Sequence, residues 1–429
     1  MITLQDCQAH DRADPLAPLR AQFDLPDGVI YLDGNSLGAL PRATAERVQR
    51  TLRQEWGQDL IQSWNSAGWF AQPLATGDKI ARLIGAGPNQ VVAADTTSVN
   101  LYKALSAAIG LARAADPARR RIVSERSNFP TDLYIAEALC REHGMVLQLV
   151  HADELPQALD EQVAVLMLTH VHYRSGRMHD MAALNARAQA LGILTVWDLA
   201  HSAGAVPVDL LGSGADFAVG CGYKYLNGGP GAPAFVWLNP RHHAQAWQPL
   251  AGWWGHARPF GFSPHYEPAP GIARFQCGTQ PMLSLVALDA GVDTVLAAEA
   301  LGGMAALRRK SLALTELFMQ TAQDELAGHG VQIVTPQDPA ARGSQVSLVL
   351  DADGYAVMQA LIAHGVIGDY RAGDPEAPHP EDRLDLLRFG MTPLYLRHTD
   401  VWQAVQTLRQ ILDQGLWRDP RHARRHAVT

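Results

Sequence analysis

The sequence predicts an α/β protein with a mainly parallel sheet in a large domain and a smaller α+β domain towards the C-terminal end. Between about residues 120 and 221, short runs of β-branched residues alternate with helical patterns. Such alternation is typical of parallel strands that are covered by helices on both faces. After about residue 290 the alternation gives way to a long helical pattern followed by mixed short segments. A chain of 429 residues can form one large core and a smaller companion domain.

The large domain is expected to contain four strands and two helices in its central part. The expected strands are RRIVSE (120–125), VAVLMLTHV (163–171), ILTVWD (193–198) and DFAVGC (216–221), and the expected helices are 130–144 and 181–192. In parallel sheets of this kind, ligands gather at the carboxyl ends of the strands. Site residues are therefore expected just after the strands, at Phe129 to Asp132, Thr169, Asp198 to His201, Tyr223 and Lys224.

The C-terminal part reads as a separate α+β domain. We expect helices at 306–326 and 356–365, strands at 331–336, 344–351 and 385–391, and a closing helix opened by Thr399 with Asp400 in its first turn. The first 45 or so residues resemble an arm that is too short to have a core of its own. The chain is therefore divided into an arm (1–45), a large domain (46–290) and a small C-terminal domain (291–429).

The composition excludes several classes of protein. Hydrophobic residues make up 47% of the chain and charged residues 18%, which is ordinary for a globular protein. A net charge of −8 argues against a nucleic-acid binder. No apolar run approaches the roughly 20 residues that cross a bilayer, and the N-terminus lacks the apolar core of a signal peptide. We expect a cytoplasmic protein that binds neither nucleic acid nor membranes.

Cysteine and histidine spacing predicts neither disulfides nor a metal site. The four cysteines are scattered and form no CxxC pair, which is typical of reduced thiols: Cys7, Cys140, Cys221 and Cys277. The histidine pairs His170/His172 and His242/His243 have no carboxylate or cysteine at ligand spacing.

Lys224 is the most informative residue, because it stands between a predicted strand and a glycine-rich turn in CGYKYLNGGPGAPAF (221–235). A lysine at a strand end can simply extend its ammonium group into water. At the ligand edge of a parallel sheet, however, a partly desolvated lysine becomes a nucleophile and can form a Schiff base. The usual partner in that chemistry is pyridoxal phosphate.

Two further features fit that cofactor, which needs an acid opposite its pyridinium nitrogen and a helix N-terminus for its phosphate. Asp198 ends a predicted strand next to the one before Lys224, although it could also cap the following helix. Thr96, Thr97 and Ser98 open a helical pattern, where plain helix capping is the alternative. No Walker motif is present in the sequence, so an NTPase is not favoured.

The motifs together resemble the kynureninase family, in the expected order and over nearly the whole chain. They are YLDGNSLG (31–38), TTSVN (96–100), SNFPTDLY (127–134), WDLAHSAGAVP (197–207), the Lys224 segment, GWWGH (252–256) and LLRFGMTPLY (386–395). This resemblance, to the bacterial type, implies the fold-type-I pyridoxal-phosphate architecture of the aspartate aminotransferase superfamily, with a sheet of the seven-stranded type. It also implies tryptophan catabolism: hydrolysis of L-kynurenine to anthranilate and L-alanine, with 3-hydroxykynurenine a poorer substrate.

The resemblance also implies roles for individual residues around the cofactor. Lys224 would carry it as a Schiff base, Asp198 would hold the ring nitrogen, and Phe129 would stack on the ring. The remaining cofactor-binding positions would be Thr97, Ser98, Pro130, Thr131, Asp132, Thr169, His201 and Tyr223, and Tyr223 would also carry a proton during catalysis.

The resemblance implies that other residues contact the substrate and the second subunit. Trp253 and Thr279 would reach the cofactor site of a neighbouring subunit, so that a homodimer shares its active sites. Gly278 and Thr279 would also contact substrate. Arg388 would bind the substrate carboxylate, its alternative being a surface arginine. Trp64 would line the aryl pocket, its alternative being a core aromatic.

Three alternatives remain open at this stage. A cysteine desulfurase or a class V aminotransferase shares the Asp198 and Lys224 pattern, but a desulfurase needs a cysteine on a mobile loop, and none of the four stands in an obvious one. A non-catalytic binding protein on the same fold would not need Lys224.

Overall fold

The computed structural model describes residues 2–377 and 379–425. It divides into two compact units, each of which is described by itself. The large unit comprises Ala43–Val171 and His179–Asp293; the small unit comprises the residues up to Arg42, His172–Met178, and those from Thr294 onward. Compactness does not reveal which segments fold independently, so the three-part division into 1–45, 46–290 and 291–429 stays a prediction.

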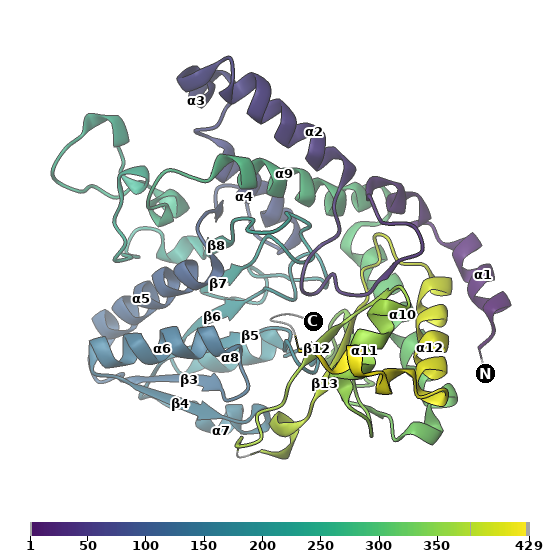
Figure 1. Ribbon diagram of the computed structural model, residues 1–429. Coiled ribbons are helices and arrows are strands. Elements are labelled where there is room, and N and C mark those ends of the chain that lie inside the picture. Colours follow the sequence, from purple (N-terminus) through teal and green to yellow (C-terminus); the bar gives the residue numbers. More distant parts are fainter. Residues whose placement is uncertain (1, 378, 426–429) are drawn as a thin grey trace. The chain divides into compact units, whose positions relative to one another are not determined.

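The large unit is built on a seven-stranded sheet with the order β2-β8-β7-β6-β5-β3-β4 (Figure 1). Its strands are β2 (Val91–Ala93), β3 (Arg121–Glu125), β4 (Val146–Val150), β5 (Val163–Thr169), β6 (Leu194–Asp198), β7 (Phe217–Gly220) and β8 (Phe235–Leu238). The pairs from β4 through β7 are parallel, whereas β8 pairs antiparallel with both β7 and β2. The predicted mainly parallel sheet is thereby confirmed.

The large unit contains several helices, and the longest of them packs against the sheet. They are α2 (Arg42–Arg50), α3 (Ser63–Ser66), α4 (Gln72–Leu83), α5 (Thr97–Ala115), α6 (Pro130–His143), α7 (Leu155–Ala158), α8 (Met181–Ala190) and α9 (Met282–Leu296). Helix α5 contacts α6 and the strands β5 to β8. Its Leu101, Leu105, Ala108 and Ala112 recur at helical spacing and are buried in the core.

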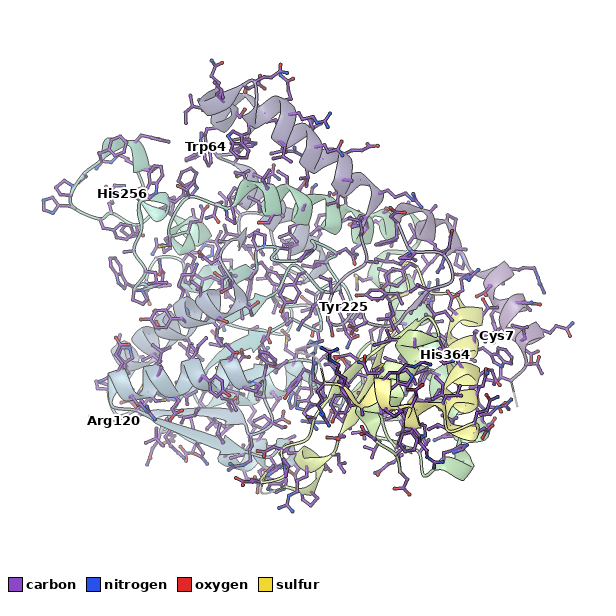
Figure 2. The ribbon with its side chains drawn as sticks, viewed as in Figure 1. Cys7, Trp64, Arg120, Tyr225, His256 and His364 are labelled. Atoms are coloured by element: carbon purple, nitrogen blue, oxygen red, sulfur yellow. The ribbon has the colours of Figure 1, made fainter. Side chains whose placement is uncertain are left out.

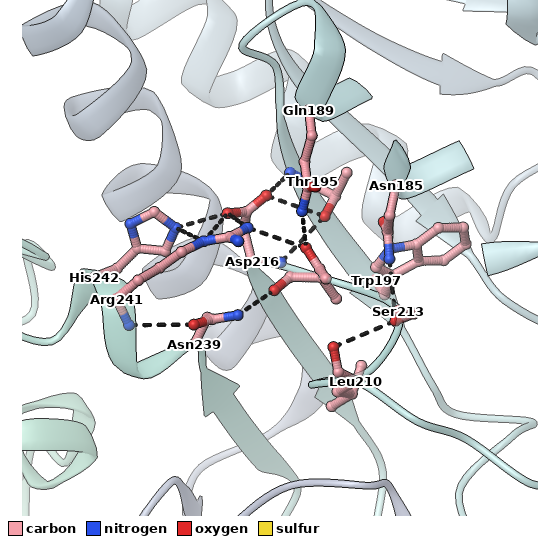
Figure 3. Close-up of polar contacts among 12 residues, drawn as sticks. Asn185, Gln189, Thr195, Trp197, Leu210, Ser213, Asp216, Asn239, Arg241 and His242 are labelled. Carbon is pink, nitrogen blue, oxygen red and sulfur yellow. Dashed lines mark hydrogen bonds and ion pairs between the residues drawn. The ribbon is translucent and has the colours of Figure 1, made fainter. Parts of the chain in front are cut away.

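A buried carboxylate, Asp216, ties β6 to the segments around β7 and β8 (Figure 3). It accepts hydrogen bonds from the backbone N–H of Thr195 at 2.9 Å and from the ring of His242 at 2.6 Å, and Arg241 lies within 2.5 Å. These partners hold the pKa of Asp216 below its usual value against the opposing effect of burial. His242 thus belongs to a structural network rather than to a metal site.

The small unit combines a four-stranded antiparallel sheet, in the order β12-β13-β10-β9, with a pair of short parallel strands. Its strands are β1 (Ile30–Tyr31), β9 (Gln332–Ile333), β10 (Gln345–Val349), β11 (Val366–Ile367), β12 (Asp369–Arg371) and β13 (Leu386–Gly390), and its helices are α1 (Leu4–Ala13), α10 (Gly303–Glu325), α11 (Gly354–Ala363) and α12 (His398–Asp413). The predicted α+β character is confirmed.

The closing helix begins differently from the prediction. It starts at His398 with Arg397 at the cap position, so Thr399 does not open it. The side chain of Asp11 in α1 accepts hydrogen bonds from the backbone N–H groups of His398 at 2.6 Å and Thr399 at 3.2 Å. A distant carboxylate therefore satisfies the first turn, which the local sequence could not indicate.

Within the described ranges, no helix has both the length and the apolar character of a membrane span, and no group of three or more His, Cys, Asp or Glu side chains is arranged to hold a metal ion. All four cysteines are free; three are buried and Cys277 is partly exposed.

Candidate active site

Asp198 lies at the carboxyl edge of the large sheet. It is the last residue of β6 and pairs in register with Thr169 at the end of β5 and Val219 in β7. Its Oδ1 accepts a hydrogen bond from the N–H of Ala200 at 2.8 Å, and its Oδ2 is 3.5 Å from the hydroxyl of Thr169. The side chain is buried, so its carboxylate is held in a defined direction at the strand end.

Lys224 follows β7 at the same edge, where the glycine-rich turn folds the chain back. A Cβ at Gly222 would collide with the carbonyl oxygen of Pro233, so only glycine permits this close approach. The turn is closed by a 2.9 Å hydrogen bond from the N–H of Gly228 to the carbonyl of Gly222. The Nζ of Lys224 lies 3.3 Å from Nε2 of His201, which brings two predicted site residues together.

Asp132 adds a second buried carboxyl group near Lys224. It stands in the first turn of α6, and its Oδ2 is enclosed without a hydrogen-bond partner among the residues that the structure describes. Burial and the charge of Asp198 raise its pKa well above the usual value, while Lys224 opposes this rise. Burial likewise raises the pKa of Asp198, again against the influence of Lys224. The amine of Lys224 thus opposes the rise in pKa of both Asp132 and Asp198, and the titration of each acid depends on the charge of the other.

Phe129 directly precedes α6, the helix that carries Asp132. Its side chain is 42% exposed immediately before α6 begins at Pro130, and Thr131 follows in the first turn. Asn128, which the sequence analysis did not single out, fixes this segment. Its amide donates to Ser124 at 3.2 Å, and its Oδ1 accepts from the backbone N–H of Phe129 at 2.7 Å and from the hydroxyl of Thr169. The only signal for Asn128 in the sequence was its place within the motif SNFPTDLY (127–134).

The N-terminus of α5 reaches the same edge of the sheet. Strand β8 begins beside the end of β7, at the Gly220–Phe235 pair. Just before β8, the N–H of Ala234 donates to the carbonyl of Asp95 at 2.9 Å, which is two residues before α5 starts. Thr97 and Ser98 therefore open α5 at the level of the residues that follow β7. Helix N-termini with small hydroxyl residues bind phosphate groups.

Tyr223 neighbours Lys224 and stays a neutral phenol at ordinary pH. Burial raises its pKa, and the nearby Cys221 and Asp198 raise it further. The Lys224 Nζ lies 5.7 Å from the centre of the Tyr223 ring. A protonated phenol at this position can donate a proton or a hydrogen bond.

These residues fit pyridoxal phosphate. The donor set contains an amine for the aldehyde, a buried carboxylate for the ring nitrogen, an exposed aromatic ring for stacking and a 19-residue helix whose N-terminus can receive a phosphate. The enclosed Oδ2 of Asp132 offers one more polar atom that a ring substituent would satisfy.

A second set of predicted residues meets around Trp254. The ring centres of Trp64 and Trp253 lie 5.0 and 4.7 Å from that of Trp254 (Figure 2 labels Trp64). The backbone N–H of Trp254 donates to the carbonyl of Cys277 at 3.2 Å, which brings this cluster next to Gly278 and Thr279 in the chain. Gly278 and Thr279 are both exposed.

Arg388 belongs to the small unit, where it lies in β13 and is 1% exposed. Its guanidinium group contacts the carboxylate of Asp369 and donates to the carbonyl of Tyr173, and it lies 3.2 Å from the hydroxyl of Ser36. It is therefore not a surface arginine. Ser36 lies in the motif YLDGNSLG (31–38), but its sequence position alone indicated no role for it.

The fold and the Lys224 site together define a fold-type-I pyridoxal-phosphate enzyme. A solved cysteine desulfurase from Thermococcus onnurineus NA1 has the same fold, with a TM-score of 0.76 over 92% of this chain and 98% of that one, at 19% identity. At this identity the likeness concerns the fold alone.

Sequence comparison identifies the family. The chain is 55% identical to a kynureninase of Burkholderia pseudomallei and 54% identical to one of Pseudomonas fluorescens, in both cases over 100% of both chains. Residues 307–408 match the model of the kynureninase C-terminal domain. The chain belongs to the kynureninase family. The enzyme family and the cofactor predicted from the sequence are thereby confirmed.

Proposed function

We propose that this chain hydrolyses the Cβ–Cγ bond of L-kynurenine, releasing anthranilate and L-alanine, in tryptophan catabolism. The observation that carries the proposal is the arrangement of Lys224, Asp198 and Asp132 at one edge of the large sheet, in a member of the kynureninase family. A binding protein would have no use for an amine placed against two coupled buried acids. The cytoplasmic location stays a prediction from the sequence.

The bound cofactor supplies an electron-withdrawing ring that stabilises negative charge next to the substrate's amino-bearing carbon. Lys224 would hold the cofactor through its amine, and as a free amine it would remove the proton at Cα of the substrate. Asp198 would keep the ring nitrogen protonated, since a buried carboxylate with fixed hydrogen bonds favours a neighbouring positive charge. Phe129 would stack on the ring, and Thr97 and Ser98 would bind the phosphate at the start of α5.

The hydrolysis adds one water molecule across the Cβ–Cγ bond. The hydroxyl group of the water ends on the carbonyl carbon, which leaves as the carboxyl group of anthranilate, and a proton ends on Cβ, which becomes the methyl group of alanine. Tyr223 is proposed to carry the proton at the carbonyl centre. Its raised pKa supports this role, because a phenol that stays protonated at neutral pH is available as a donor.

Arg388 is proposed to bind the α-carboxylate of the substrate. A guanidinium group pairs with a carboxylate through two parallel hydrogen bonds, which fixes orientation as well as charge. The support is the burial of Arg388 together with its match to the LLRFGMTP motif.

A homodimer with shared sites is proposed from the Trp254 cluster. The surrounding apolar side chains are exposed to an unusual degree: Trp253 by 41%, Phe260 by 62% and Phe262 by 78%. Contiguous apolar surface of this kind is typical of a protein interface. A second copy covering it would receive Trp253, Gly278 and Thr279 at its own cofactor and substrate sites, as the family resemblance implies.

The experiment that tests the function is kynurenine turnover by the purified, cofactor-loaded protein. Anthranilate fluorescence should rise in step with alanine, at one molecule of each per kynurenine. Turnover of cysteine with sulfide release, and no anthranilate, would instead favour a desulfurase.

A further inference from the structure

The guanidinium group of Arg388 sits in a closed polar cluster of the small unit. Asp369 of β12 stands opposite Arg388 in the strand register and binds it directly. The hydroxyl of Ser36 lies between them, 3.2 Å from Arg388 Nη2 and 3.1 Å from Asp369 Oδ2. The Nε of Arg388 is enclosed and has no hydrogen-bond partner in the described part of the chain. The Nε–H group of this buried cation can therefore donate a hydrogen bond to an added acceptor.

A second carboxyl group, Asp33, belongs to the same cluster. The N–H groups of Ser36 and Leu37 donate to its carbonyl at 2.9 and 3.0 Å, which folds the Asp33 to Ser36 turn onto the arginine. The residue is only partly buried, but its Oδ1 is enclosed and accepts no hydrogen bond from any described residue. Burial and the charge of Asp369 raise the pKa of Asp33 to about 7, against the opposing effects of Ser36, Arg388 and Arg371.

When Asp33 is ionised, the charges around it balance only in the absence of substrate. Two carboxyl groups, Asp33 and Asp369, face two guanidinium groups, Arg388 and Arg371, the latter 3.0 Å from Asp369. The neighbouring phenol of Tyr31 stays neutral, because burial and the same two acids raise its pKa. A substrate carboxylate on Arg388 would be a third negative charge in this enclosure. Like charges held close together in a low dielectric do not all stay ionised.

We propose that Asp33 takes up a proton when the α-carboxylate of the substrate binds at Arg388. The inference rests on the proposed role of Arg388. Asp33 is then a positioning residue: its neutral form frees Arg388 from one competing anion, and its ionised form repels the substrate. Asp369 remains the permanent partner of Arg388, because it also pairs with Arg371.

The consequence is a pH-dependent affinity. Below pH 7 Asp33 already carries its proton, so binding is insensitive to pH at this group. Above pH 7 binding must first protonate Asp33, and affinity falls by up to tenfold per pH unit. With asparagine at this position the dependence disappears, and at pH 8.5 the variant binds up to about 30-fold more tightly than the wild type.

The test uses the cofactor-loaded enzyme with L-alanine as the probe. Its Kd is read from the cofactor absorption between pH 6 and 8.5 for the wild type, Asp33→Asn and the control Asp27→Asn, an exposed acid from the same N-terminal segment. The slopes of kcat/KM for kynurenine are measured in parallel. Wild type and Asp27→Asn should lose alanine affinity above pH 7. Asp33→Asn should lose less, so that at pH 8.5 it binds up to about 30-fold more tightly than the wild type. Identical slopes in all three proteins would overturn the inference.

Two further measurements keep the outcomes apart. Calorimetry of alanine binding in buffers of different ionisation enthalpy should give about one proton more taken up at pH 8 by the wild type than by Asp33→Asn; equal uptake would also overturn the inference. If Asp33→Asn does not fold, Asp33→Ser replaces it. Arg388→Gln tests the underlying role, and an unchanged alanine affinity in this variant would show that Arg388 does not bind the carboxylate. If Arg388→Gln binds alanine more weakly but Asp33→Asn keeps the pH dependence of the wild type, the Asp33 inference alone is refuted.

Discussion

Replacing Asp33 by asparagine should stabilise the folded protein at alkaline pH. An ordinary aspartate has a pKa of 3.8, whereas burial and Asp369 raise that of Asp33 to about 7. Between these two values the folded chain holds a proton that the unfolded chain has released. The free energy of unfolding therefore falls as pH rises through this window and levels off above pH 7. The asparagine side chain of the variant has no proton to lose, so this contribution is absent from it.

The size of the effect follows from the two pKa values. A tenfold difference in proton affinity corresponds to about 1.4 kcal/mol. Between pH 5 and 8 the free energy of unfolding of the wild type should thus fall by about 2.6 kcal/mol relative to that of Asp33→Asn. Urea unfolding followed by circular dichroism at pH 5, 6, 7 and 8 measures this difference. Equal protein concentration and cofactor saturation keep mass-action contributions the same.

The control again is Asp27→Asn, which removes an exposed acid and should follow the wild type at every pH. Parallel unfolding profiles of the wild type and Asp33→Asn would refute the reasoning, because Asp33 would then titrate alike in the folded and unfolded chains. Such a result would also remove the electrostatic basis for proton uptake on substrate binding.

The other predictions concern the acid, the aryl pocket and the subunits. Asp198→Ala should bind cofactor weakly and lose most of its Cα deuterium exchange, and Asp198→Glu should retain more; equal exchange in all three proteins would contradict the role of the acid. Trp64→His should shift the kcat/KM ratio of kynurenine to 3-hydroxykynurenine towards the hydroxylated substrate by up to about a hundredfold, since the smaller ring gives space and a hydrogen-bond partner. An unchanged ratio would show that Trp64 does not line the aryl pocket. Mixing Lys224→Ala with Trp253→Ala subunits should create one intact site per hybrid dimer; no gain in activity after proven subunit exchange would count against shared sites.

The central part of the fold could be predicted because its signals are local. The strands before Asp198 and Lys224 are continuous apolar runs, and the helix after Pro130 ends at Gly144, which has a φ of 62°. Strand β4 was missed because its residues at the sheet edge are mostly half-buried and carry a polar Gln148. The start of α12 was predicted wrongly because its N-terminal groups are satisfied by Asp11, a residue almost 400 positions away.

The candidate site was partly predictable for a similar reason. Asp198 ends a strand, Lys224 follows the next strand and Thr97 opens a helix, so the topology of a parallel sheet brings them to one edge. Asn128 accepts a hydrogen bond from Thr169, and the charge of Asp33 interacts with that of Arg388. Neither interaction can be recognised from the spacing of residues in the sequence. Such residues become visible only when segments from distant parts of the chain are packed together.

The most direct test of the central claim is the fate of Lys224. The purified wild type should be yellow, borohydride should bleach it, and peptide mapping should place the reduced cofactor on Lys224. Lys224→Ala should keep its circular dichroism spectrum, lose the absorption band and release no anthranilate from kynurenine. A labelled lysine elsewhere in the chain, or kynurenine turnover by a folded Lys224→Ala protein, would contradict the account.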